Sequence, residues 1–181
     1  MKFRLNVNMT EQDYLDYNVF VMTRSSFGKK TMNRTKYVLI LLFITIIIFL
    51  LFVGKFSTWA FVSSLSFAIS TIYVLVFYKK IMIKSIKKVI KDYKKDNKLP
   101  VDLNSVLEFY DDFFVETTTN MKEEVKYSAI ERISVVDNKV IYIHKDNINA
   151  YILSLSCFES KEQQDTFFEF INTKCANINI Y

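Results

Sequence analysis

Residue types that carry much of enzyme chemistry are scarce in this chain. Its 181 residues include two glycines, one histidine and two cysteines. Two isolated glycines, Gly28 and Gly54, cannot form a glycine-rich loop that holds phosphate through backbone amides. The only histidine, His144, would need a second ligand or an orienting carboxylate nearby to act in catalysis or metal binding. Cys157 and Cys175 lie 18 residues apart, a spacing that matches no zinc-binding pattern. We therefore expect no catalytic residues, no metal site and no cofactor.

Charge is missing from a long central segment. The 42 residues from Tyr37 to Tyr78 contain a single charged residue, Lys55, which follows Gly54. A helix crosses a bilayer with about 20 apolar residues, so this segment is about twice the length that one crossing needs. It predicts a transmembrane hairpin over residues 37–78 with its turn at Gly54-Lys55. The two predicted spans are residues 37–53 and 56–78.

The second span carries small residues at steps of three or four, which places them on one helix face. Such a stripe lets two helices approach closely in lipid. The pattern favours packing against the first span, with a homodimer interface as the alternative. Neither span contains Asp, Glu, His, Lys or Arg, so a proton or ion pathway is not expected. The stripe consists of Ser57, Ala60, Ser64, Ala68 and Thr71.

The two halves of the chain have opposite charge. Residues 1–100 contain 17 Lys and Arg against 5 Asp and Glu, whereas residues 101–181 contain 7 against 14. The positive charge flanks the hairpin, and the acidic half would repel phosphate, so nucleic acid is not an expected partner. Because basic residues flank both spans while the turn has only Lys55, the positive-inside rule predicts a multi-pass protein of the cytoplasmic membrane with both termini cytoplasmic.

Residues 79–100 form a basic connector. Its first part has an apolar stripe opposite a lysine-rich face, which predicts an amphipathic helix that continues the second span. Asn97–Pro100 then marks a linker. The lysines either set the topology alone or also bind anionic lipid headgroups. The lysines expected at the membrane surface are Lys79, Lys80, Lys84, Lys87, Lys88 and Lys91.

The N-terminal arm, residues 1–36, begins with a strand pattern. Phe3, Leu5 and Val7 alternate with polar residues, which predicts a half-buried strand over residues 2–8. Thr10 followed by an acid three residues later predicts the start of a helix over residues 11–23. A strand needs a partner, and the tail is the only other source of strands. We therefore expect the arm to pack on the tail as one cytoplasmic unit.

Residues 101–181 predict a β-rich domain that ends in a helix. Short strands at close spacing are separated by turn signals such as Asp137-Asn138. The expected fold is a membrane α-helical hairpin plus an α+β cytoplasmic domain, whose small antiparallel sheet is pleckstrin-homology-like. The predicted strands are 105–111, 113–118, 121–127, 133–136, 140–145 and 150–154, and the predicted helix is 160–175.

Three features together resemble the bacterial YcxB-like membrane proteins. They are the arm segment Thr10-Glu11-Gln12-Asp13-Tyr14, the two adjacent spans, and Tyr127-Ser128-Ala129-Ile130-Glu131-Arg132-Ile133. In that family an aromatic-Ser-x-aliphatic-x-x-aliphatic stretch links two strands of the C-terminal domain. The resemblance implies an integral membrane protein with a cytoplasmic domain, and it brings no reaction or catalytic residue.

The leading functional hypothesis is an inner-membrane protein that presents a small interaction domain. The domain would bind a protein segment or lipid headgroups, without catalysis. The alternative is an immunity- or stress-type membrane protein that acts through its hairpin on a partner in the bilayer. A membrane-associated enzyme with an unrecognised site ranks lowest. The expected partners are the lipid bilayer and an unidentified protein, with anionic lipid headgroups and a second copy of the chain as further alternatives.

Overall fold

The computed structural model describes most of the chain. Two predictions fall outside the described residues: the hairpin turn at Gly54-Lys55 and the linker at Asn97–Pro100. The residues described are 1–53, 58–95 and 102–181.

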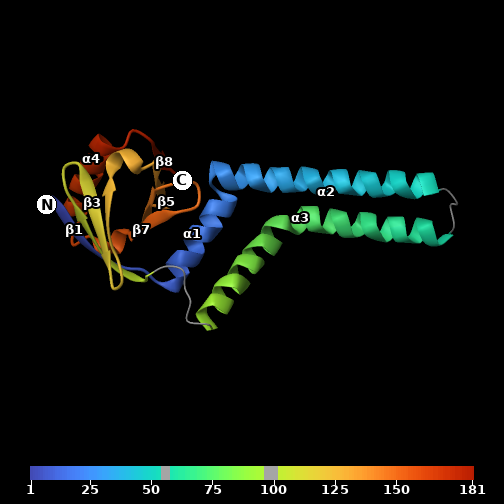
Figure 1. Cartoon of the computed structure of the whole chain (residues 1–181), viewed down its shortest axis with the longest axis horizontal. Coiled ribbons are helices and arrows are strands. Elements are labelled where there is room, and N and C mark those ends of the chain that lie inside the picture. Colours follow the sequence, from blue (N-terminus) through green and yellow to red (C-terminus); the bar gives the residue numbers. More distant parts are fainter. Residues whose placement is uncertain (54–57, 96–101) are drawn as a thin grey trace. The chain divides into compact units, whose positions relative to one another are not determined.

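The contacts within the chain define two units (Figure 1). The first, which we call the sheet domain, combines Met1–Asn18 with Asp92–Tyr181. The second, the helical unit, is Val19–Lys91. The helical unit is therefore inserted into the sequence of the sheet domain.

The first sheet of the sheet domain has four antiparallel strands in the order β1-β2-β3-β4. β1 comes from the arm and pairs with β2, with Phe3 opposite Phe109 and Leu5 opposite Leu107. Leu5 and Val7 are buried while their neighbours in the strand are exposed, which explains the alternating sequence. The arm thus supplies an edge strand to the C-terminal domain. The strands are β1 (Phe3–Asn8), β2 (Asn104–Phe109), β3 (Phe113–Thr118) and β4 (Lys122–Lys126).

The second sheet has the order β7-β6-β5-β8. β5 and β6 are joined through Asp137 and Asn138, whose φ angles of 51° and 50° lie in the left-handed region that Asp and Asn tolerate. β8 runs parallel to β5, with Ile133 opposite Ile178. The strands are β5 (Arg132–Val136), β6 (Val140–His144), β7 (Ala150–Ser154) and β8 (Ile178–Ile180).

The last helix, α4 (Lys161–Lys174), contributes to the core of the sheet domain. Its side chains Phe167 and Ile171 are buried. The Phe167 ring centroid lies 5.0 Å from that of Phe109 and 5.3 Å from that of Phe3. Aromatic side chains from both the arm and the tail therefore pack on one helix face.

The predicted order of two long apolar helices, antiparallel strands and a C-terminal helix is confirmed, with boundaries within two residues in the tail. Two details of the prediction are wrong. The strands form two sheets rather than one, and β8 follows the helix and pairs in parallel. β8 escaped prediction because its three residues are too few for a periodic pattern.

The helical unit contains two long helices, α2 (Ser26–Val53) and α3 (Thr58–Lys95), which lie side by side in Figure 1. α2 begins well before the predicted span, because its first basic turns contain no proline and Gly28 lies at the very start of the helix, where it does not interrupt it. α3 runs from the second span into the lysine-rich segment without interruption, as predicted.

Most apolar side chains on these two helices face outward. Phe52 is 88% exposed and Trp59 is 83% exposed. The helices are long and apolar enough to cross a membrane, and none of their apolar segments is buried within the chain. Between them, the rings of Phe43 and Phe67 stack with centroids 5.9 Å apart. Exposed apolar surface of this extent is stable against hydrocarbon and costly in water.

α1 (Glu11–Thr23) and α2 meet at a tight corner. Ser25 is buried there; its hydroxyl donates to the Val21 carbonyl at 2.5 Å and accepts from the Gly28 amide at 3.0 Å. A Cβ atom on Gly28 would lie 2.0 Å from the Val21 carbonyl oxygen and 2.6 Å from the Met22 carbonyl. The close approach of the two backbones therefore requires glycine at this position.

Candidate binding cleft

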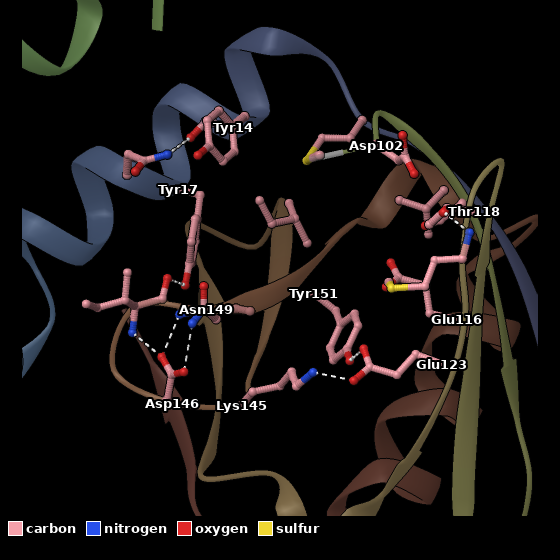
Figure 2. A pocket seen from close by; sticks show the side chains of 18 residues that line it. Tyr14, Tyr17, Asp102, Glu116, Thr118, Glu123, Lys145, Asp146, Asn149 and Tyr151 are labelled. Carbon is pink, nitrogen blue, oxygen red and sulfur yellow. Dashed lines mark hydrogen bonds and ion pairs between the residues drawn. The ribbon is translucent and has the colours of Figure 1, made fainter. Parts of the chain in front are cut away.

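The sheet domain contains an open cleft of about 640 Å³ (Figure 2). Three parts of the fold form its walls: the first turns of α1, the β2–β4 side of the first sheet, and the turn between β6 and β7 with the start of β7. The cleft thus brings together the arm, the middle of the tail and the β6–β7 hairpin, which are distant in sequence.

A polar cluster connects the two sheets at one end of the cleft. The Lys145 ammonium lies 2.6 Å from Glu123 Oε1, and the Tyr151 hydroxyl donates to Glu123 Oε2 at 3.0 Å (Figure 2). The same ammonium is 5.7 Å from the centre of the Tyr151 ring. The hydrogen bond from Lys145 lowers the pKa of the Glu123 carboxyl, whereas burial raises the pKa of the Tyr151 hydroxyl. Glu123 is therefore a carboxylate with its cation already in place.

Glu116 is a second carboxyl group in the cleft, and it lacks such a cation. It is half-buried on β3, and burial raises its pKa although a hydrogen bond with the Ser105 side chain opposes the shift. The negative charges of Glu123 and Asp102 raise this pKa further, whereas the positive charge of Lys145 lowers it. Glu116 also stands directly opposite Glu123 in the β3–β4 pair, an arrangement that is unfavourable for like charges.

The turn between β6 and β7 holds one rim of the cleft in place. Asp146 Oδ1 accepts from the backbone amides of Ile148 and Asn149 at 2.7 and 2.8 Å. A hydrogen bond from the Asn149 side chain, followed by these two from the backbone, lowers the pKa of the Asp146 carboxyl. The Tyr17 hydroxyl donates to the Ile148 carbonyl at 2.5 Å, which fixes the turn to α1.

The lining of the cleft combines negative charge with apolar surface. Among the residues that the structure describes, the lining includes one cationic side chain, Lys145, and several carboxylates. Met121 is 49% exposed and Ile148 is 58% exposed at the cleft. Such a surface favours a cation that carries apolar groups, and it disfavours phosphate. The carboxylates of the lining are Asp102, Glu116, Glu123 and Asp146.

The small-residue stripe and the membrane-surface lysines predicted from the sequence lie outside the cleft, and those that the structure describes are on α3. The stripe positions Ser64, Ala68 and Thr71 are half-buried, while Ser57 and the side chain of Ala60 lie outside the described residues. The lysines expected at the membrane surface are all exposed, and the Lys80 ammonium lies 5.5 Å from the centre of the Phe77 ring. None of these residues lines the cleft.

His144 is a buried residue of β6 rather than a surface group. It is 0% exposed, and its Nε2 atom lies 3.1 Å from the hydroxyl of Ser134, which is also 0% exposed. The Tyr17 ring packs beside it, with centroids 6.1 Å apart. Burial, followed by the positive charge of Arg132, lowers the pKa of His144 to about 4. Within residues 1–53, 58–95 and 102–181 no group of three His, Cys, Asp or Glu side chains could hold a metal ion.

The depressed pKa of His144 predicts acid sensitivity of the sheet domain. The folded state keeps the imidazole neutral until the pH nears 4, whereas in the unfolded chain it gains its proton near pH 6.5. The stabilising contribution of His144 is therefore complete above pH 6.5 and is lost as the pH falls toward 4, by roughly 1.4 kcal/mol for each pH unit in that window. We expect His144→Gln to flatten this part of the pH profile, as measured by urea unfolding. Equal slopes for the two proteins would contradict the assignment.

The two apolar helices and the α+β domain define the class, a membrane protein. Residues 109–171 match the family model described as YcxB-like protein. The chain thus carries a YcxB-like domain and fits the YcxB-like family, as the resemblance predicted. The segment quoted for that resemblance forms the 3₁₀ turn Tyr127–Ala129 between β4 and β5 and the start of β5. No curated protein and no solved structure matches the chain.

Proposed function

We propose that this chain is a multi-pass protein of the cytoplasmic membrane whose hairpin presents the sheet domain to the cytoplasm. There the cleft binds a segment of another protein.

The pairing of β1 with β2 is the observation that supports two membrane crossings. β1 precedes α2 and β2 follows α3, yet the two strands are neighbours in one sheet, in register from Phe3↔Phe109 to Asn8↔Asn104. Both flanks of the helix pair must therefore lie on the same side of a bilayer. Two crossings by α2 and α3 satisfy this condition, whereas a single crossing violates it. The basic residues beside the apolar segments of both helices favour the cytoplasm as that side.

The strand order supports a pleckstrin-homology-like roll. A four-stranded sheet is followed by the three antiparallel strands β5, β6 and β7 and then by α4. β8 is an addition to that order. In this arrangement the hairpin lies within the connection between the first and second strands.

The charge of the cleft supports a protein segment over an anionic lipid headgroup as its ligand. Its carboxylates would repel a phosphate group, and its lysine already pairs with Glu123. The exposed lysines of α3 would attract a phosphate group instead of repelling it. They set the topology and contribute attraction to anionic lipid of about 1 kcal/mol per lysine near the surface.

Photo-crosslinking in intact cells tests the proposal. A photoreactive residue at Ile148, at the cleft, should capture a specific protein. The matched control is Ile180, which is 78% exposed and does not line the cleft. Capture from Ile148 and not from Ile180 supports the proposal. The same products from both positions, or none from Ile148 in the folded protein, would refute it.

A further inference from the structure

We propose that the occupant of the cleft is a basic, amphipathic protein segment. A lysine or arginine side chain of that segment enters beside Glu116, and its apolar neighbours cover Met121 and Ile148. This inference rests on the proposed function and names the chemistry of the partner.

The shape and charge of the cleft supply the first argument. In the described lining, the ammonium group is that of Lys145, which lies 2.6 Å from Glu123 and forms an ion pair with it. Asp146 is occupied by the amides of its own turn. In the part of the chain that the structure describes, no ion pair involves the carboxylate of Glu116 or Asp102. Space remains for a cation, since the cleft measures about 640 Å³.

The second argument is the energetic position of Glu116. Its carboxylate is half-buried and stands opposite Glu123, so its charge is unfavourable in the free protein. The raised pKa of Glu116 agrees with this geometry. A guanidinium or ammonium group between these carboxylates would remove the repulsion and form a charge-assisted hydrogen bond. A residue that costs stability in the free protein and gains from a cation is expected at a binding site.

The third argument is the apolar surface beside the charges. Met121 and Ile148 are 49% and 58% exposed, and the rings of Tyr14, Tyr17 and Tyr151 also line the cleft (Figure 2). A methionine side chain adapts to apolar groups of varied shape. A tyrosine ring packs against a cation through its face. A soluble polyamine would leave this surface uncovered, whereas an amphipathic segment would bury it.

The test uses the full-length protein in uncharged maltoside micelles. The probe is a fluorescein-labelled, amidated peptide of repeated Lys-Leu-Leu units, and its binding is followed by fluorescence anisotropy. Glu116→Gln is expected to weaken binding by at least about tenfold, the effect of losing one charge-assisted hydrogen bond. Glu124→Gln is the matched control, because Glu124 is an exposed glutamate of the neighbouring strand β4 and does not line the cleft. It should change affinity less than twofold.

A stability measurement separates binding from folding. Because the pKa of Glu116 is raised in the folded state, its ionised form destabilises the protein at pH 7, so Glu116→Gln should unfold at an equal or higher temperature than the wild type. Weaker binding with a lower unfolding temperature would assign Glu116 a structural role and overturn the inference. Equal losses in the two variants, or equal binding of a Glu-Leu-Leu peptide, would also overturn it. If crosslinking from Ile148 succeeds while the peptide fails, only the chemistry of the partner is wrong.

Discussion

Phe109→Ala is expected to remove most of the stability of the sheet domain. Phe109 is 0% exposed, and its ring centroid lies 5.2 Å from that of Phe114 and 5.0 Å from that of Phe167. It is also the partner of Phe3 across β1 and β2, so it joins the arm, the first sheet and α4. A buried Phe→Ala change costs about 3–5 kcal/mol, against a total of roughly 5–15 kcal/mol for a typical domain.

Hydrogen–deuterium exchange of the full-length protein in micelles measures this loss. Exchange of the amides of β2 and β3 should accelerate by two orders of magnitude or more, since about 1.4 kcal/mol corresponds to a factor of ten. Ile180→Ala is the control, because this isoleucine is 78% exposed. Its exchange should stay close to that of the wild type. Unchanged protection in Phe109→Ala would show that the aromatic cluster is not the core of the domain.

Gly28→Ala is expected to have the second large effect. The added Cβ would stand 2.0 Å from the carbonyl oxygen of Val21, and the contact is with backbone that cannot rotate away. The corner between α1 and α2 must shift, and the hydrogen bonds of Ser25 to Val21 and Gly28 would be strained or lost. Overpacking of this kind costs about 1–3 kcal/mol, and the loss of the Ser25 bonds adds to it.

Limited proteolysis at the corner measures the effect of Gly28→Ala. Cleavage between residues 20 and 30 should become faster in this variant. Lys29→Ala is the control, because Lys29 is the next residue and its side chain is exposed. Equal cleavage of the two variants would contradict the requirement for glycine at position 28.

Periodicity in the sequence was sufficient to predict the main elements. The alternation of Phe3, Leu5 and Val7 predicted a half-buried strand, because only one face of that strand meets the core. The lack of charge between Tyr37 and Tyr78 identified the apolar helices. Local pattern failed at β8, where three residues follow a helix and the parallel partner is more than 40 residues away in sequence.

The cleft could not be predicted in the same way, because long-range register creates it. Glu116 and Glu123 become opposite one another only through the pairing of β3 with β4, and Lys145 arrives from the other sheet. Tyr17 joins the cleft through a hydrogen bond to Ile148, 131 residues further along the chain. A signal did exist: two glutamates at facing positions of a predicted hairpin are unfavourable unless something compensates them.

The side of the membrane reached by each segment tests the central claim most directly. Single cysteines replacing Asn6 in β1, Lys55 and Glu124 in β4 would be probed with a membrane-impermeant maleimide, in a background where Cys157 and Cys175 are serine. We predict labelling of position 55 in intact cells, and labelling of positions 6 and 124 only after the membrane is opened. Labelling of positions 6 and 124 from opposite sides, or recovery of the protein in solution without detergent, would contradict a hairpin that holds both strands of one sheet in the cytoplasm.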